Sequence, residues 1–274
     1  AVCSKIMSRV SAIVVTYHTG HRLKECLYAL STDPEIHELV IVDHGNPEPM
    51  SDWISDFSAQ RDDVTLLRGH GNIGFGAGVN LGVSAASGDH LLIINPDAVL
   101  KRRSVSALQS VAKDLSNPWI VGGKIFDIQG REERGPRRRE LTLWRALTSF
   151  LGVNTWTLEQ TPAPHAPIEM DVISGAIFLT SRKSFQELGG FDEGYILHVE
   201  DIDLCARCRD AGGTVMYQPA AGALHYGATS DALGRTIAKH KADGLARYFR
   251  TRAKGPFHRA ITEVLLPFIR LGLV

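Results

Sequence analysis

Carboxylates that directly follow apolar runs are the first candidates for chemistry in this chain. Asp97 ends the turn Asn95-Pro96-Asp97, which comes directly after the apolar run 91–94. A carboxylate in that position suits a hard divalent cation that bridges two phosphate groups. Taken alone, the tripeptide is more typical of an ordinary turn, because Asn-Pro and Pro-Asp pairs both favour turns. Asp43 ends another apolar run, at 38–43, so two acids share this placement.

A second acidic group spans residues 192–203 and runs into a helical pattern at about 200–211. Acids in the first turn of a helix are favoured by its dipole, which is sufficient to explain Asp203. A carboxylate beside another acid can instead be tuned as a general base that removes a proton from an attacking hydroxyl. We therefore predict that Asp201 is the base and that Glu200 supports it.

His225 follows a strand-like stretch at 214–217 and a turn at Pro219. A neutral imidazole there could supply a second metal ligand, although a lone histidine is more often structural. The cysteines offer less, because only Cys205 and Cys208 have a recognisable spacing and a zinc site would need a second pair. We expect these two thiols to lie on a helix with no metal or redox role, in a reducing compartment.

The glycine-rich run Gly69-His70-Gly71-Asn72-Ile73-Gly74 satisfies the G-x-G-x-x-G pattern of dinucleotide sites. That pattern normally follows the first strand of its unit, whereas the first strand here leads into Thr16-Tyr17-His18-Thr19-Gly20. A lone match is a weak signal. We expect the glycines to allow close approach of a ligand rather than to mark a nicotinamide site.

The elements that must position these groups alternate between strand and helix. Four apolar runs are typical of buried strands, and two segments between them have helical spacing: strands at 10–15, 38–43, 64–67 and 91–94, helices at 23–30 and 77–87. This order predicts an α/β fold with a mostly parallel sheet covered on both faces by helices. Ligands of such sheets gather beyond the carboxyl ends of the strands, where Asp43 and Asp97 lie. A further core strand is predicted at 172–180.

Two segments stand outside this pattern. Residues 127–168 are rich in arginine, tryptophan and proline and are predicted to leave the core, either as a solvated basic loop or as a contact for an anionic acceptor such as a phosphate-bearing lipid. The tail 256–274 mixes arginines with many apolar residues. It is predicted either to lie on a membrane surface as an interfacial helix or to pack on the core.

The bulk composition is that of an ordinary globular protein. Of 274 residues, 44% are hydrophobic, and 30 basic side chains balance 30 acidic ones, so the total charge does not favour nucleic acid as a partner. The N-terminal residues lack a signal-peptide pattern, and no stretch of 18 uncharged apolar residues occurs. We expect a cytoplasmic protein without a membrane-spanning segment. Whether it forms a homo-oligomer is left open.

Taken together, the motifs resemble the large inverting glycosyltransferase family 2, and within it the bacterial rhamnosyltransferase-like members. The resemblance covers nearly all of positions 10–230. It is carried by the order and spacing of six short motifs: Val14-Val15-Thr16-Tyr17, Val42-Asp43, Asn72-Ile73-Gly74-Phe75-Gly76 through Asn80, Asn95-Pro96-Asp97, Gly189-Gly190-Phe191-Asp192-Glu193, and Glu200-Asp201-Ile202-Asp203-Leu204-Cys205-Ala206-Arg207.

The resemblance implies a GT-A fold, a Rossmann-like, mostly parallel sheet flanked by helices, over residues 1–230. Its donor half would be about 1–100 and its acceptor half about 101–230, including the basic excursion 127–168, and residues 231–274 would form a C-terminal helical extension. The donor would be a dTDP- or UDP-sugar. The residues implied to bind it are Thr16, Tyr17 and Asp43 at the nucleoside, Asn72, Gly74 and Asn80 along the pocket, and Asn95 with Asp97.

The resemblance also implies roles for the acidic motifs. Asp97 stands at the second acid of the family's D-x-D metal motif, His225 matches its late metal-binding histidine, and Asp201 is similar to the base of its E-D motif. The metal would be Mn2+ or Mg2+. Two departures from the family pattern bear on metal affinity and on base selectivity: Asn95 replaces the first acid of D-x-D, and His44-Gly45-Asn46 stands where Asn-x-Ser is more usual.

The predicted reaction is a single in-line displacement that inverts the anomeric carbon. The acceptor would be a glycan or a polyprenyl-diphosphate-linked precursor of the cell envelope, reached by peripheral contact with the inner face of the membrane. Two other classes remain open. A nucleotidyltransferase should carry a glycine-rich, basic phosphate loop directly after the first strand, which is missing here. A non-catalytic nucleotide-sugar-binding protein would keep the pocket but would need no base.

Overall fold

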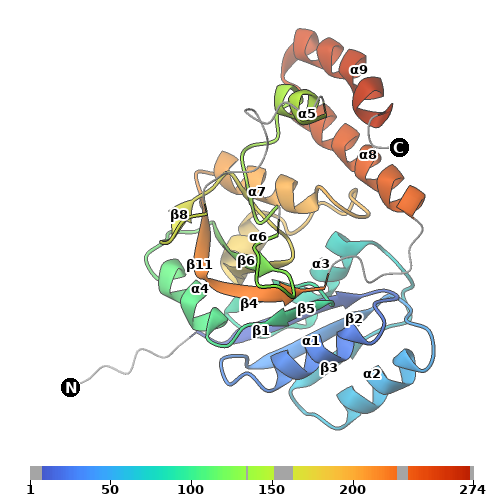
Figure 1. The fold of residues 1–274 in the computed structure, drawn as a ribbon, viewed down its shortest axis with the longest axis vertical. Helices are drawn as coiled ribbons and strands as arrows, with labels where there is room; N and C mark the ends of the chain where they lie inside the picture. The colour runs from blue at the N-terminus through green and yellow to red at the C-terminus, as the bar shows by residue number, and fades with distance from the viewer. Residues whose placement is uncertain (1–7, 134, 151–162, 227–233, 272–274) are drawn as a thin grey trace.

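The computed structural model of the chain describes residues 8–133, 135–150, 163–226 and 234–271. Its centre is a mixed nine-stranded sheet (Figure 1). Strand β1 (Val10–Thr16) pairs in parallel with β2 (Glu38–Asp43) and β4 (His90–Ile94), and β3 (Val64–Leu67) continues the parallel part beyond β2. These four apolar segments are the predicted strands, confirmed to within a residue at their ends.

The other half of the sheet contains antiparallel pairs. Strand β10 (Ile177–Ser181) runs antiparallel between β4 and β6 (Trp119–Phe126), and β11 (Thr214–His225) pairs in parallel with β6. Strands β5 (Ala98–Leu100) and β8 (Ile168–Glu169) each pair antiparallel with β11. The fold is therefore α/β with a mostly parallel donor-side sheet, as predicted, while its second half mixes strand directions.

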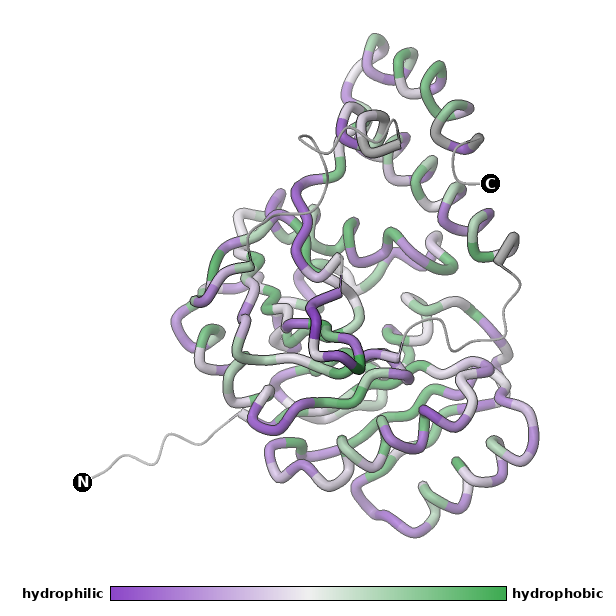
Figure 2. Tube along the Cα trace, viewed as in Figure 1, coloured by the Kyte–Doolittle hydropathy of each residue, from purple (hydrophilic) through white to green (hydrophobic). Residues whose placement is uncertain are grey.

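One face of the sheet is covered by helices that share an apolar cluster with it. Side chains alternate between faces along a strand, and in β1 Ala12 and Val14 lie in the cluster on this side. The helices are α1 (Arg22–Ser31), α2 (Met50–Ala59) and α4 (Ser104–Ala112). In Figure 2 the central strands are largely hydrophobic, whereas hydrophobic and hydrophilic residues alternate along the helices.

The opposite face packs against a different set of helices. Here Ile13 and Val15 of β1 join a second apolar cluster. The helices are α3 (Phe75–Ala85), α6 (Arg182–Glu187) and α7 (Glu200–Asp210). A small two-stranded sheet of β7 (Arg137–Arg138) and β9 (Val172–Ile173) lies beside α7.

The C-terminal helices form an extension at one end of the molecule (Figure 1). Helix α8 (Gly234–Arg252) packs on α9 (Gly255–Leu271), and α5 (Leu143–Phe150) contacts α9. Leu245, Tyr248 and Phe249 of α8 are buried in the same cluster as α7. None of the helices within the described ranges is long and apolar enough to cross a membrane. The predicted helical tail is confirmed, and the predicted domain boundary near 230 falls in residues 227–233, outside the described residues.

Two sequence predictions about strands were wrong. The stretch 172–180 is two strands in different sheets, β9 and β10, because the chain turns between them at Ser174-Gly175-Ala176. The predicted turn at Pro219 lies inside β11, which runs on to His225 with a register shift between Gln218 and Gly222. A bulge accommodates proline because it leaves residues outside the ladder of hydrogen bonds, where the missing N–H is not needed.

Candidate active site

The predicted donor residues meet where β1 and β2 end. Thr16 and Asp43 are register partners, so both side chains lie at the same carboxyl edge of the sheet. Thr16 is completely buried and Asp43 is nearly so, whereas the neighbouring Tyr17 is 39% exposed. The structure thus brings together three of the residues that the sequence assigns to the nucleoside end of a donor.

Asn46 links these strand ends, a role that the sequence did not reveal. Its side-chain amide donates to Thr16 Oγ1 at 3.0 Å and to Asp43 Oδ1 at 2.9 Å, while its carbonyl oxygen accepts from the Thr19 N–H at 3.2 Å. Asp43 Oδ1 also accepts the backbone N–H groups of Gly45 and Asn46. The other carboxylate oxygen, Oδ2, lies 3.6 Å from Arg68 Nη2.

His44 lies directly beside this network and is almost completely buried. A Cβ placed on Gly78 of α3 would be 2.7 Å from His44 Nε2, so the glycine makes room for the imidazole. Burial first, and then the nearby His70, lowers the pKa of His44 to about 4. His44 is therefore neutral at physiological pH, and its ring lies 5.2 Å from that of His70, edge to face.

The glycine-rich run leads into α3 and is joined to the segment before α7. Gly74 has a φ of +91°, and its N–H donates to Asn72 Oδ1 at 3.0 Å. The next N–H, of Phe75, donates to the Ile196 carbonyl at 3.0 Å, and a Cβ on Gly74 would lie 3.0 Å from that same oxygen. Glycine is required here both by the left-handed backbone and by the close approach.

Asn80 is engaged with the Gly189–Glu193 motif. Its amide exchanges hydrogen bonds with the backbone N–H and carbonyl of Phe191, both at 2.9 Å, and also donates to Glu193 Oε1 at 3.0 Å. Two of the motifs that were recognised separately in the sequence therefore contact each other. A direct contact of Asn80 with the donor stays a prediction.

Asp97 and His225 come together at the ends of neighbouring strands. His225 Nε2 lies 3.3 Å from Asp97 Oδ1, and Nδ1 lies 3.0 Å from Glu133 Oε2. Burial opposes the charged imidazole, but the hydrogen bond and charge of Asp97, followed by Glu133, raise the pKa of His225 overall. The side-by-side placement follows from β11 pairing with β5, which puts His225 opposite Ala98.

This pair fits part of a divalent metal site. Mg2+ is commonly held by one or two carboxylates together with substrate phosphates rather than by a complete protein cage. A metal-binding histidine usually donates its other ring N–H to a carboxylate, as the contact of His225 with Glu133 allows. Within the described part of the chain, no group of three or more His, Cys, Asp or Glu side chains is arranged to hold a metal. Metal binding by Asp97 and His225 stays a prediction.

Asn95 contributes through its backbone to this turn. Its N–H donates to the Ala176 carbonyl at 3.0 Å, and its own carbonyl accepts from Ala98 N–H at 3.1 Å. Gly175, which precedes Ala176 in the connection between β9 and β10, donates its N–H to Asp201 Oδ2 at 3.0 Å. Two adjacent residues between β9 and β10 thus join the Asn95–Asp97 turn to the predicted base.

Asp201 lies in the first turn of α7 and is only partly exposed. Its Oδ2 also forms an ion pair with Arg138 of β7, and its Oδ1 accepts from Ile202 N–H at 2.8 Å. The turn before it is strained, because His198 and Val199 have φ values of +67° and +75°. Positive φ is especially unfavourable for a β-branched residue such as Val199.

Glu200 differs from its neighbour. It is buried, and its Oε2 has no hydrogen-bond partner. Burial first, and then the charge of Asp201, raises the pKa of Glu200 well above that of an ordinary glutamate. A carboxyl group that stays protonated near neutral pH cannot take a proton, which is compatible with the prediction that Asp201 is the base and Glu200 its support.

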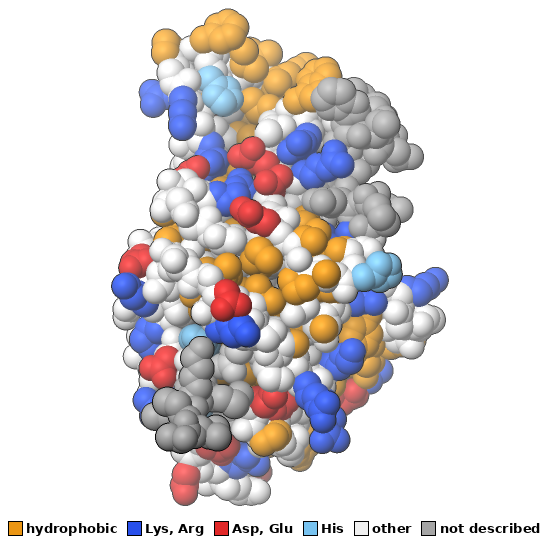
Figure 3. All heavy atoms as spheres, turned by 90° about the vertical axis from the view of Figure 1, so that its left-hand side faces the viewer, with side chains coloured by type: hydrophobic (Ala, Val, Ile, Leu, Met, Phe, Trp, Pro, Cys, Tyr) orange, Lys and Arg blue, Asp and Glu red, His pale blue; other side chains and the backbone are white. Residues whose placement is uncertain are grey.

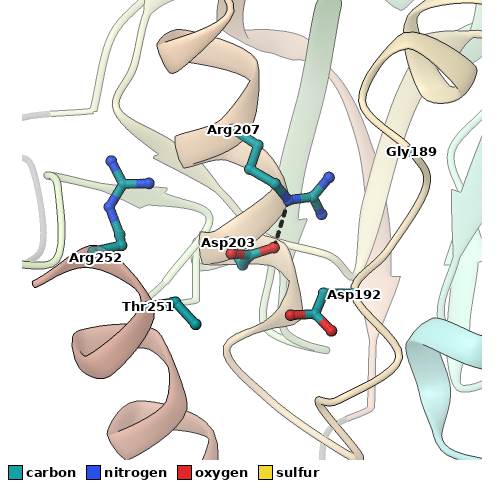
Figure 4. A pocket seen from close by; sticks show the side chains of 6 residues that line it. All are labelled: Gly189, Asp192, Asp203, Arg207, Thr251 and Arg252. Atoms are coloured by element: carbon teal, nitrogen blue, oxygen red, sulfur yellow. Dashed lines mark hydrogen bonds and ion pairs between the residues drawn. The ribbon is translucent and has the colours of Figure 1, made fainter.

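A cavity of about 380 Å³ lies on another side of α7. It is lined by the six residues drawn in Figure 4: Gly189, Asp192, Asp203, Arg207, Thr251 and Arg252. Asp203 Oδ2 accepts from Arg207 Nε at 2.7 Å. Asp192 forms an ion pair with Arg247, and Arg252 forms one with Asp210. These compensated charges connect α7 with α8, and none of the predicted donor, metal or base residues lines this cavity.

Cys205 and Cys208 both lie on α7, are buried and form no disulfide. Burial raises the pKa of each thiol to about 12. Neither side chain can therefore supply a thiolate at neutral pH.

An α/β sheet with acids at its strand ends and a carboxylate pair opening a later helix is the arrangement that the resemblance to inverting glycosyltransferases predicts. The chain matches the family model described as "Glycosyl transferase family 2" over residues 11–189. It is 30% identical over 249 residues to N-acetylglucosaminyl-diphospho-decaprenol L-rhamnosyltransferase of Mycobacterium tuberculosis, covering 84% of this chain and 79% of that protein. The chain belongs to glycosyl transferase family 2.

Two further comparisons support the family resemblance and the fold, respectively. The rhamnosyltransferase WbbL of Escherichia coli is 24% identical over 228 residues, covering 79% of this chain and 83% of that protein. The solved mannosyltransferase PcManGT of Pyrobaculum calidifontis, in complex with GDP-Man and Mn2+, has a TM-score of 0.63 at 16% identity, covering 98% of this chain and 74% of that one. The second likeness supports the fold.

Proposed function

We propose that this glycosyltransferase moves rhamnose or a similar hexose from a dTDP- or UDP-sugar to a hydroxyl of a polyprenyl-diphosphate-linked or glycan acceptor in cell-envelope synthesis. The similarity to two rhamnosyltransferases supports the sugar class. The acceptor class is supported by the mycobacterial relative, because its name specifies N-acetylglucosaminyl-diphospho-decaprenol. The observation that carries the proposal is the connection of Asp201 to the Asn95–Asp97 turn through Gly175 and Ala176.

The reaction needs a base, a donor site and charge compensation for the leaving group. Thr16, Tyr17 and Asp43 would hold the nucleoside of the donor. Asp97 and His225 would hold Mn2+ or Mg2+, which supplies positive charge for the departing diphosphate. The Asp201 carboxylate takes the proton of the acceptor hydroxyl while the oxygen attacks the anomeric carbon and the bond to the diphosphate breaks. Attack opposite the leaving group inverts the anomeric configuration.

A donor screen tests this function. Purified protein would be incubated with dTDP-rhamnose, UDP-sugars or GDP-sugars and a short-chain prenyl-diphospho-N-acetylglucosamine, with and without Mn2+ or Mg2+. We expect glycosylated acceptor with a dTDP- or UDP-sugar only when metal is present. Donors that are bound but never consumed would indicate a binding protein. In a parallel incubation with a nucleoside triphosphate and a sugar 1-phosphate, release of diphosphate would indicate a nucleotidyltransferase.

The α9 surface supports a peripheral place of action at the inner face of the membrane. Phe257, Ile261, Val264 and Phe268 are exposed at helical spacing along one face. Figure 3 shows hydrophobic side chains gathered at this end of the molecule. The nearby Lys254 and Arg259 are exposed and form no ion pair within the described residues, so they complement anionic lipid headgroups. A lipid-linked acceptor would be met at such a surface.

Vesicle binding tests the membrane contact. The protein should sediment with anionic phosphatidylglycerol vesicles and less with phosphatidylcholine vesicles. The double variant Phe257→Ser/Phe268→Ser should lose this binding while keeping transfer to a water-soluble acceptor. Tyr28→Ser serves as the control, because Tyr28 is also exposed but lies on α1, which packs on the other face of the sheet. Equal sedimentation of the double variant and the wild type would exclude α9 as the membrane contact.

A further inference from the structure

The predicted base is held in an ion pair in this structure. Asp201 Oδ2 accepts both from the Arg138 guanidinium and from the Gly175 N–H, while Oδ1 accepts from Ile202 N–H. Arg138 comes from β7, 63 residues earlier in the chain. A carboxylate that must receive a proton from an acceptor hydroxyl needs an oxygen lone pair directed at that hydroxyl. Withdrawal of the Arg138 guanidinium would free an oxygen lone pair on Asp201 Oδ2.

The three consecutive arginines of this segment have different surroundings. Arg137 is buried and forms a two-point contact with Glu132, which also accepts from the Tyr217 hydroxyl, so its charge is used within the fold. Arg139 is half-buried, and no ion pair to it is found among the described residues. Arg138 alone of the three contacts the predicted base.

Arg138 also has an unused donor. Its Nη2 contacts Asp201 and the Ile173 carbonyl, whereas its Nε is buried without a hydrogen-bond partner. A buried N–H without an acceptor costs free energy until a ligand supplies one. Phosphate oxygens match the fork of N–H donors on a guanidinium, and a diphosphate carries more negative charge than one carboxylate. The Arg138 side chain is therefore equipped to bind a phosphate in place of Asp201.

We propose that Arg138 binds the phosphate nearest the sugar of the acceptor, and that this contact releases Asp201 to act as the base. The inference rests on the proposed function. Without acceptor, the ion pair keeps Asp201 from deprotonating water, so the donor is protected from hydrolysis. With acceptor, the guanidinium moves to the phosphate and Asp201 faces the acceptor hydroxyl. An ordinary structural ion pair would have no such dependence on acceptor phosphate.

Hydrolysis of the donor provides the first test. In hydrolysis, water replaces the acceptor: its proton goes to Asp201, its oxygen bonds to the anomeric carbon and the nucleoside diphosphate leaves. We expect Arg138→Gln to raise hydrolysis in the absence of acceptor about tenfold, because the base is no longer paired. Arg139→Gln, the matched control, should leave hydrolysis at the wild-type rate. Unchanged or slower hydrolysis in Arg138→Gln would overturn the proposal.

Two acceptors provide the second test. The wild type should have a lower KM for prenyl-diphospho-N-acetylglucosamine than for an alkyl glycoside of N-acetylglucosamine, which has no phosphate. Arg138→Gln should lose this difference by raising only the first KM, and Arg138→Lys should restore part of it. Equal loss of transfer to both acceptors would indicate a structural role and would contradict the proposal.

A measurement on the unmodified protein covers the case in which the variant does not fold. Inorganic phosphate, added with the free metal concentration held constant, should accelerate donor hydrolysis by the wild type. No acceleration would count against the proposal. The outcome also separates the two hypotheses: a wild type that transfers sugar but ignores phosphate overturns only the Arg138 inference. A wild type that neither transfers nor hydrolyses any nucleotide sugar overturns the proposed function as well.

Discussion

Gly244 of α8 packs directly against Val199, the residue before the Glu200-Asp201 pair. A Cβ on Gly244 would lie 3.2 Å from Val199 Cγ2 and 3.1 Å from the His198 carbonyl oxygen. The C-terminal extension therefore contacts the turn with positive φ that positions the predicted base. Backbone strain of this kind persists only when surrounding packing maintains it.

Gly244→Ala tests this contact. Alanine favours a helix over glycine by about 1 kcal/mol, so α8 itself should not be weakened. The added methyl group should displace the turn and lower kcat about tenfold with little change in donor KM. Steady-state kinetics would measure this, with Lys239→Ala, an exposed change on the same helix, as the control. Adding Val199→Gly should restore part of kcat, and a variant with wild-type kcat would show that the contact is unimportant.

Asn46→Ala should weaken the donor site. The change removes the amide donor to Thr16 and Asp43 and leaves the buried Thr19 N–H without its acceptor, at a cost of about 1–3 kcal/mol in unfolding free energy. The KM for the sugar nucleotide should rise more than kcat falls, since Asp201 is untouched. Asn46→Ser keeps one hydroxyl and should be intermediate. Denaturant unfolding and donor titration would check both effects, and an unchanged donor KM would argue against the assigned nucleoside end.

Glu200 should make stability depend on pH. Its pKa is raised in the folded protein above the ordinary value of 4.5, so the protonated folded state is favoured. This contribution is complete below pH 4.5 and is lost as the pH rises through the folded pKa of about 8. Glu200→Gln, which cannot ionise, should therefore gain in Tm relative to the wild type from pH 5 to pH 9. A difference in Tm that stays constant over this range would contradict the burial of a protonated Glu200.

Glu133→Gln tests the metal assignment through a residue that would not bind the metal itself. Loss of the carboxylate that holds His225 Nδ1 should raise the Mn2+ concentration needed for half-maximal activity by roughly 10- to 100-fold. Chelation with EDTA should abolish wild-type transfer, and added Mn2+ should restore it. Glu169→Gln, an exposed change on β8, is the matched control. An identical Mn2+ requirement in Glu133→Gln and the wild type would argue against His225 as a metal ligand.

The first half of the fold was predictable because its signals are local. The runs 38–43 and 64–67 are apolar, short and bounded by polar residues, and the strands found there have the same limits. The second half was harder to predict, since β10 is antiparallel and Gly175 divides one apparent strand into two. Strand β6 and helix α4 were not predicted, although both contribute to the core.

The site shows the same limit. The predicted residues Thr16, Asp43, Asp97 and His225 are brought together in pairs, because each lies at a strand end that the motifs mark. The residues that form hydrogen bonds or ion pairs with the predicted site residues lie far away in the sequence or, like Asn46, in a motif that departs from the family pattern. Arg138 is 63 residues from Asp201 and Glu133 is 92 residues from His225, so no local pattern could reveal either contact. Asn46 was visible only as a departure from the usual motif.

We propose that Asp201 removes the acceptor proton during inverting transfer. A single-turnover assay of Asp201→Asn with dTDP- or UDP-sugar and acceptor tests it most directly, with Asp210→Asn on the same helix as the control. We expect a transfer rate lower by roughly a hundredfold or more, with donor binding preserved. Transfer by Asp201→Asn at the wild-type rate would contradict it.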